Sequence, residues 1–209
     1  DPRGRDFRLS SEPQEYLFVK AIPDRTSVYV GEQVTLSFYI YYRVRFRLVD
    51  RRDPPLADFM RVEVGGDEHV QTRVGRWHYN VRLLDRLALF PLRAGELETG
   101  EMTISVESPR LGRDRVSRIS DSVTINVKEP PKEGRPVGYT LGDTGRFKLE
   151  ATVSPREITS GETVAVQARL TGLGALPTKL KLPERTGLEW LTPERTEDVS
   201  LHRGRVGGW

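Results

Sequence analysis

The feature that most constrains this chain is an alternation of apolar and polar residues with a period of two, which begins at Val34. The apolar, even-numbered set comprises Val34, Leu36, Phe38, Ile40, Tyr42, Val44, Phe46 and Leu48. Successive side chains of a strand point to opposite faces of a sheet, so this run predicts one strand, or two strands, with one buried face. Shorter runs of the same period begin at Trp77, Met102 and Val123. Together they predict an all-β chain of antiparallel sandwiches with no helix before Lys128.

Composition narrows the protein class. Fourteen prolines and nineteen glycines interrupt the 209 residues too often for long helices, which argues against a mostly helical enzyme. The absence of cysteine excludes a disulfide framework, thiol catalysis and thiolate metal sites. No run approaches the roughly 18 apolar residues that a membrane span needs, so the sequence predicts a soluble piece. Because the chain opens at Asp1, we interpret it as a processed or excised fragment.

A polar, proline-rich segment divides the chain after Lys128 and is typical of a semi-stiff linker. We expect an N-terminal extension over 1–15, a first sandwich over 16–128, a linker over 129–145 and a second sandwich over 146–209. In the second sandwich, we expect strands around Phe147–Val153 and Val164–Leu170, a loop at Thr171–Gly174 and a short strand near Thr178–Leu182. An immunoglobulin-like sandwich needs about 100 residues, so the second one is expected to be partial.

The two halves repeat at an offset of 130 residues, which places Gly31 on Gly161 and Glu32 on Glu162. The glycine precedes the alternating strand each time and is expected to supply a positive φ in a tight turn. The glutamate after it is interpreted as a turn residue rather than as a catalytic carboxylate. Two tandem immunoglobulin-like modules explain this repeat.

Nothing in the sequence points to catalytic chemistry. The three histidines lack the spacing of a zinc site, and His78 is expected to be a solvated strand residue. Asp50, Asp53 and Asp58 are interspersed with arginine and proline, which indicates a solvated loop rather than a calcium loop. We therefore nominate no catalytic, cofactor-binding or metal-binding residues and expect a protein that is not an enzyme.

The odd-numbered face of the long alternating run is the most distinctive candidate surface. It is expected to point outward and to present Tyr39, Tyr41, Arg43, Arg45 and Arg47. These residue types are enriched at binding hot spots, so a protein-binding face is one interpretation. Cross-strand packing of arginine stems over tyrosine rings is a second interpretation, and single-stranded nucleic acid binding is a third. Nucleic acid is the least favoured, because the net charge is only +3 and the charges are interspersed rather than concentrated.

Four segments resemble the BatD family of bacterial oxygen-tolerance (aerotolerance) proteins. Tyr29–Leu36 is similar to the opening of an interior module of that family, and Arg86–Leu97 is similar to a strand and turn near the module's end. Ser160–Val164 and Gly172–Leu176 resemble the next opening and the loop after it. Each motif is common in β-sandwiches, but their order and spacing together are more specific.

The resemblance implies a string of immunoglobulin-like domains on the periplasmic side of the bacterial inner membrane. It implies a membrane-anchored parent with a signal peptide before these domains and a transmembrane helix after them. It also implies protein partners, namely von Willebrand factor A-domain membrane proteins and, indirectly, a MoxR-type ATPase. The family offers no established catalytic residues or cofactors.

The sequence thus favours a non-enzymatic scaffold that docks protein partners through exposed strand faces or edges. An alternative from another class is a carbohydrate- or peptidoglycan-binding stalk. Its candidate aromatic platforms are Trp190 and Trp209, whereas Trp77 shares the parity of Tyr79 and Val81 and is expected in the core. A third hypothesis is that a surface carboxylate completes a metal site on a von Willebrand-type partner.

Overall fold

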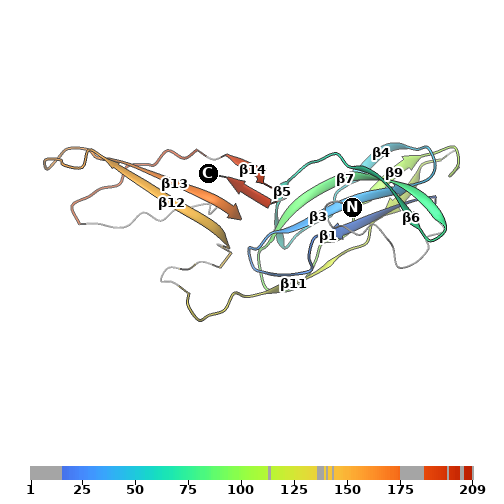
Figure 1. The fold of residues 1–209 in the computed structure, drawn as a ribbon, viewed down its shortest axis with the longest axis horizontal. Coiled ribbons are helices and arrows are strands. Elements are labelled where there is room, and N and C mark those ends of the chain that lie inside the picture. The colour runs from blue at the N-terminus through green and yellow to red at the C-terminus, as the bar shows by residue number, and fades with distance from the viewer. Residues whose placement is uncertain are drawn as a thin grey trace.

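The computed structural model describes residues 16–112, 114–135, 139, 141–142, 144–174, 186–196, 198–202 and 205–208. Every regular element in these ranges is a strand, which confirms the all-β prediction. The strands form an elongated molecule in which two groups of strands lie end to end (Figure 1). Within the described ranges, no helix is long and apolar enough to cross a membrane.

The first module contains three sheets. The largest has the order β1 (Leu17–Pro23), β3 (Val34–Tyr42), β7 (Trp77–Pro91) and β5 (Phe59–Glu63), with β6 (His69–Val74) also paired to β7. The two smaller sheets have the orders β10 (Val116–Ile119), β9 (Thr103–Glu107), β4 (Arg47–Arg52) and β2 (Ser27–Tyr29), β11 (Thr124–Lys128), β8 (Gly95–Glu98). All pairs are antiparallel except β2 with β11, which are parallel.

The main core lies between the large sheet and the two smaller ones. The even-numbered residues of β3 from Val34 to Ile40 are buried in it, as their alternation predicts. They pack with apolar side chains from the opposing layer, including Leu97, Ile104 and Ile125. Removing such side chains from water is worth about 1.5–3 kcal/mol each and is the main stabilising contribution to a sandwich.

The long alternating run is two strands rather than one. β3 ends at Tyr42 in the large sheet, and β4 begins at Arg47 in a smaller sheet. Residues 43–46 therefore cross from one layer of the sandwich to the other. This crossing lies at the end of the first module that is farthest from the second module (Figure 1).

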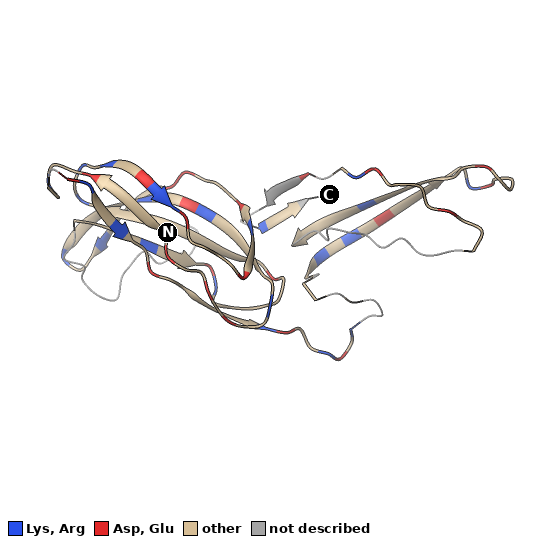
Figure 2. Ribbon diagram, turned by 180° about the vertical axis from the view of Figure 1, so that it is seen from behind, with Lys and Arg blue, Asp and Glu red and all other residues tan. Residues whose placement is uncertain are grey.

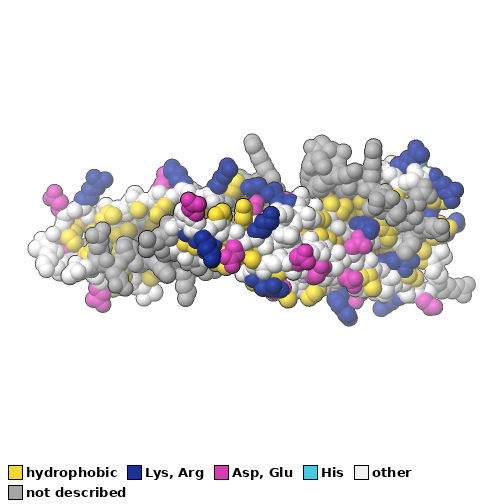
Figure 3. All heavy atoms as spheres, turned by 90° about the horizontal axis from the view of Figure 1, so that it is seen from below, with side chains coloured by type: hydrophobic (Ala, Val, Ile, Leu, Met, Phe, Trp, Pro, Cys, Tyr) yellow, Lys and Arg dark blue, Asp and Glu magenta, His cyan; other side chains and the backbone are white. Residues whose placement is uncertain are grey.

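The second module is a single described sheet with the order β12 (Gly145–Ser154), β13 (Ala165–Gly174), β15 (Arg205–Gly208), β14 (Val199–His202). The two strands predicted first, β12 and β13, are confirmed. Apolar residues on one face of the β12–β13 pair, among them Leu149, Val153 and Val166, are exposed, and hydrophobic side chains are visible over this module in Figure 3.

The predicted loop at Thr171–Gly174 is wrong, because these residues continue β13 and pair with the first residues of β12. A Cβ atom on Gly172 would overlap the main chain of Arg146 and the ring of Phe147. The glycine therefore permits a close strand contact here rather than a chain reversal. The short strand expected near Thr178–Leu182 lies outside the described residues.

The repeat at offset 130 is a repeated turn. Gly31 and Gly161 have φ values of +76° and +95°, as the sequence predicts. The amide of Glu32 donates to the carbonyl of Tyr29 at 2.9 Å, and the Glu32 carboxylate accepts a bond from the amide of Tyr29 at 3.1 Å. Glu162 makes the same pair of bonds with Thr159, at 3.0 and 2.8 Å. Both glutamates therefore close a turn, which confirms their interpretation as turn residues.

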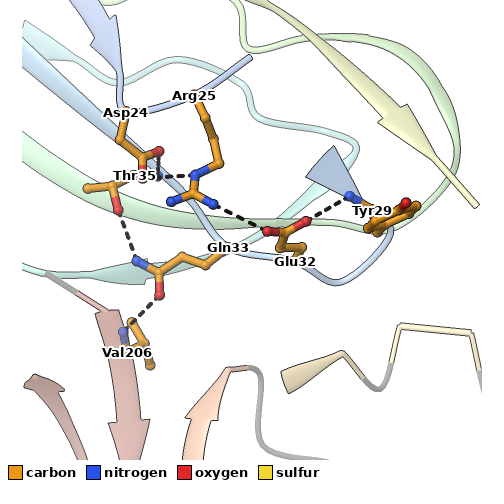
Figure 4. A network of polar contacts seen from close by, with 7 residues as sticks. All are labelled: Asp24, Arg25, Tyr29, Glu32, Gln33, Thr35 and Val206. Carbon is orange, nitrogen blue, oxygen red and sulfur yellow. Dashed lines mark hydrogen bonds and ion pairs between the residues drawn. The ribbon is translucent and has the colours of Figure 1, made fainter. Parts of the chain in front are cut away.

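The two modules touch at this turn (Figure 4). The amide of Val206 donates a 2.8 Å hydrogen bond to the side-chain oxygen of Gln33. The Val206 side chain is buried against Ala88 and Phe90 of β7. The hydroxyl of Thr144, at the end of the predicted linker, donates to the carbonyl of Val30 at 2.8 Å. The contact thus joins a strand of the second module and the residues before β12 to one end of the first sandwich.

Candidate functional site

The predicted outward face of the alternating run is wrong for its two tyrosines. Tyr39 and Tyr41 are both 0% exposed. They lie in a second apolar cluster on the opposite face of the large sheet, and Tyr41 stacks on Phe18 with ring centroids 4.8 Å apart. The remaining members of this cluster are Val74, Tyr79, Val81 and Leu83. Apolar side chains cover both faces of the large sheet, so both faces are buried. Whether a residue is odd- or even-numbered in the alternating run therefore did not distinguish buried from exposed residues.

A buried polar cluster surrounds the Tyr39 hydroxyl. This hydroxyl donates to Glu68 at 2.7 Å and accepts a 3.1 Å bond from Arg86. Arg86 also forms a 2.8 Å ion pair with Glu68 and donates to the hydroxyl of Ser37 at 3.1 Å. Burial alone would lower the pKa of Arg86, but its hydrogen bonds to Glu68 and Tyr39 outweigh burial and raise it. These contacts tie Glu68, in the segment before β6, to β3 and β7, which is a structural role.

Of the three arginines of the predicted face, Arg45 and Arg47 are exposed, whereas Arg43 is half-buried. Arg47 forms a 2.6 Å ion pair with Glu107, which also accepts a 3.3 Å bond from Arg115. The hydrogen bond from Arg47 is the largest cause that holds the pKa of Glu107 below its ordinary value. Arg43 and Arg45, in contrast, line a surface groove.

We call this hollow the end groove. It has a volume of about 680 Å³ and is lined by Tyr16, Arg43, Val44, Arg45, Trp77, Ser108, Pro109 and Arg110. These residues come from the start of β1, the crossing at 43–46, the start of β7 and the turn after β9. In antiparallel sheets, the start of one strand lies beside the end of its neighbour, so these four segments meet at one end of the sandwich.

Guanidinium groups and aromatic rings alternate along the end groove. The Arg43 guanidinium carbon lies 4.6 Å from the ring centroid of Tyr16 and 4.1 Å from that of Trp77. Arg110 lies over Tyr16 at 5.7 Å, and Arg76 lies over Trp77 at 5.0 Å. We call this set, Arg110–Tyr16–Arg43–Trp77–Arg76, the arginine ladder. Each cation–π contact is worth about 0.5–1 kcal/mol at an exposed site, so the ladder holds its arginines in place before any partner arrives.

The expectation that Trp77 lies in the core is wrong. Trp77 is 36% exposed, whereas Tyr79 and Val81 of the same parity are buried. Trp77 is the first residue of β7, directly after the turn at Gly75–Arg76, so arginines rather than apolar side chains cover its ring. His78 is exposed, as predicted.

A second groove of about 530 Å³ adjoins the end groove and shares Arg45, Ser108 and Pro109 with it. Its lining adds Phe46, Arg47, Glu107 and Gly112. Glu107 is the acidic residue of the two linings, and Arg47 and Arg115 already pair with it. Figures 2 and 3 show side chains of both signs of charge along the length of the molecule, so the excess of arginine in these two linings is a local feature. The combined surface is therefore cationic and partly apolar.

The other candidate residues are not brought together into a site. Asp58 binds Arg93 through two bonds of 2.8 and 2.7 Å, and Asp53 pairs with Arg51 at 2.9 Å. Asp50 lies in β4 rather than in a loop, which corrects the expectation for that residue. Within the described part of the chain, no group of three or more histidine or acidic residues could hold a metal ion. Trp190 is partly exposed, and Trp209 lies outside the described residues.

The partners of Arg43 did not follow from the sequence pattern. Tyr16 and Trp77 contact Arg43, and Arg110 contacts Tyr16. All three are distant from Arg43 along the chain, and the strand order brings them together. A usable signal was present, because each of the three lies beside a predicted strand end or turn. Comparison of strand ends across the sandwich would have grouped them.

No family model, curated protein or solved structure matches this chain. Its function is therefore inferred from the geometry of the end groove and from the resemblance of its sequence motifs.

Proposed function

We propose that this chain is a non-enzymatic, extracytoplasmic interaction module that docks a protein partner through the end groove. The observation that supports this function is the arginine ladder, which places pre-ordered Arg, Tyr and Trp side chains around an open hollow. These three residue types dominate the binding energy of protein interfaces. Side chains that are already ordered lose less conformational entropy on binding, which favours association.

The two-module arrangement suits a scaffold. The contact between Gln33 and Val206 lies at one end of the first sandwich, and the end groove lies at the other. The described strands of the second module therefore lie away from the end groove. A scaffold of this kind displays its binding surface at a distance from the rest of the chain.

The BatD resemblance supplies the biological setting of this proposal. The parent protein is membrane-anchored, and this part of it stands on the periplasmic side of the bacterial inner membrane. Its partners are von Willebrand factor A-domain membrane proteins, with a MoxR-type ATPase engaged indirectly, in an assembly for oxygen and stress tolerance. The module's role there is to hold partners together rather than to carry out chemistry.

Site-specific crosslinking in cells tests the proposal. A photo-crosslinking amino acid replaces Val44 in the end groove of the full-length parent, and a second strain carries it at Arg61, an exposed residue of β5. We expect crosslinks to a von Willebrand factor A-domain protein from position 44 and not from position 61, with mass spectrometry as the readout. Equal crosslinking at both positions, or no protein product at position 44, would overturn the proposal.

A further inference from the structure

We infer that the segment bound in the end groove is an extended acidic peptide whose carboxylates pair with Arg45 and Arg110. This inference rests on the proposed function and specifies its ligand. Three properties of the end groove support this inference. Its lining is positively charged, guanidinium groups lie over its aromatic rings, and a second groove extends it along the crossing at 43–46.

Charge is the first property. The lining of the end groove holds Arg43, Arg45 and Arg110 and no acidic residue. Arg45 and Arg110 form no ion pair within the described part of the chain. No described carboxylate therefore neutralises these two guanidinium groups, and an anionic ligand would gain charge-assisted hydrogen bonds from them.

The guanidinium groups that lie over the two rings bear on which class of ligand fits the groove. Sugars and nucleic acid bases bind to proteins by stacking on open aromatic faces. Here, two guanidinium groups lie over Tyr16 and two lie over Trp77. These guanidinium groups compete with a sugar or a base for the faces of the two rings. A stacked guanidinium keeps its N–H groups directed outward in its own plane, which matches the two oxygens of a carboxylate.

The shape of the surface indicates a chain rather than a single anion. The end groove continues past Arg45 into the adjoining 530 Å³ groove beside Phe46. Along the crossing, cationic Arg43 and Arg45 alternate with apolar Val44 and Phe46. An extended peptide that alternates acidic and apolar side chains has the same period of two and meets both kinds of residue.

Fluorescence anisotropy with the full 209-residue chain tests this inference. The probe is a fluorescein-labelled octapeptide of alternating Glu and Val, and the matched peptide has Gln in place of Glu. We expect the Glu peptide to bind with an affinity that falls as salt is added, and the Gln peptide to bind at least about tenfold more weakly, because the charge-assisted bonds are lost.

Two charge reversals locate the site. Arg45→Glu and Arg110→Glu should each weaken binding of the Glu peptide by about tenfold or more. The matched control is Arg61→Glu, which reverses an exposed arginine of β5 and should change the affinity by less than about twofold. Equal effects of all three variants would show a diffuse charge interaction and overturn the inference.

The remaining outcomes separate this inference from the proposed function. Tighter binding of a sulfated oligosaccharide or an oligothymidylate of equal charge, lost in Arg45→Glu, would overturn the acidic peptide as ligand. If crosslinks from position 44 to a protein persist while the Glu peptide fails to bind, the inference fails and the proposed function stands. If both are absent, both fail.

Discussion

The main-chain amide of Val206 donates a 2.8 Å hydrogen bond to the side-chain oxygen of Gln33, 173 residues earlier in the chain. The side-chain nitrogen of Gln33 donates in turn to the hydroxyl of Thr35 at 2.9 Å, so its orientation is fixed. Figure 4 shows how this bond connects β15 to the segment between the Gly31 turn and β3. One glutamine therefore links the two modules directly.

Replacement of Gln33 by Ala should loosen this link. The variant removes one hydrogen bond, worth about 1 kcal/mol, so the Val206 amide should exchange with solvent about fivefold faster. Hydrogen exchange followed by NMR measures this rate. Gln71→Ala is the control, because Gln71 bonds to Asn80 within the first module and its loss should not affect Val206. Unchanged protection of Val206 in Gln33→Ala would contradict the prediction.

Gly31 serves both its turn and the module contact. A Cβ at this position meets a positive φ and overlaps the carbonyl oxygen of Gly142, which belongs to the linker. Gly31→Ala should therefore accelerate exchange at Val206 and lower stability by more than the roughly 1–2 kcal/mol that a left-handed conformation costs.

The repeat provides a matched control for this variant. Gly161 has φ +95°, but a Cβ added there would meet no atom within 4 Å. Gly161→Ala should therefore show only the conformational cost and leave Val206 unaffected. Urea unfolding and hydrogen exchange distinguish the two variants, and equal effects of both on Val206 would be inconsistent with a contact at Gly31.

Glu68 should be essential for the stability of the first module. Its carboxylate neutralises Arg86, and the two side chains are only 11% and 9% exposed. Glu68→Ala leaves a buried guanidinium without its counter-charge and should lower the free energy of unfolding by about 3–5 kcal/mol. Glu63→Ala, at an exposed position of β5, should change it by less than about 0.5 kcal/mol. Denaturant unfolding measures both, and a similar small loss in each would show that the cluster contributes little.

The carboxyl group of Asp58 should titrate below its ordinary pKa of 3.8, chiefly because Arg93 hydrogen-bonds to it. A depressed pKa means that the ionised form stabilises the fold. That contribution is complete above the ordinary pKa and is lost as the pH falls through the folded-state pKa. Arg93→Ala should return the pKa of Asp58 towards 3.8, as carboxyl carbon NMR can follow.

Asp85 provides an internal reference of opposite sign in the same spectra. Burial raises its pKa, so its ionisation destabilises the fold and stability is gained as the pH falls through its folded-state pKa. Arg93 is not among the groups that shift Asp85, and the pKa of Asp85 should therefore stay raised in Arg93→Ala. A pKa of Asp58 that does not move in this variant would be evidence against the hydrogen bond as its cause.

Much of the fold followed from local periodicity. The even-numbered residues of β3 and the glycine of the repeated turn were predicted correctly, because each depends on neighbours only a few residues away. The buried state of Tyr39 did not follow. Its burial depends on Glu68 and Arg86, which are 29 and 47 residues away and reach it through the strand order. Tyr39 shares the odd-numbered set of the alternating run with arginines, and this local pattern does not indicate that the second face of the sheet is also buried.

The candidate site was likewise predicted only in part from the sequence. Arg45 is exposed as predicted and Arg43 is half-buried, and both line the end groove. Tyr16 and Trp77, which complete the arginine ladder, belong to other strands and were not assigned to this surface. Parity along one strand predicts which residues share a face. It does not predict which strand ends meet at one end of a sandwich.

Tyr41 and Arg45, which the sequence placed on one face, should respond differently to the same substitution. Tyr41→Ser removes a fully buried ring that stacks on Phe18 and should lower the free energy of unfolding by about 3–5 kcal/mol. Arg45→Ser alters an exposed side chain and should change it by less than about 0.5 kcal/mol, while it weakens binding of the Glu peptide. Thermal unfolding and peptide anisotropy on both variants separate packing from binding. A stable Tyr41→Ser variant would show that this ring is not part of a core.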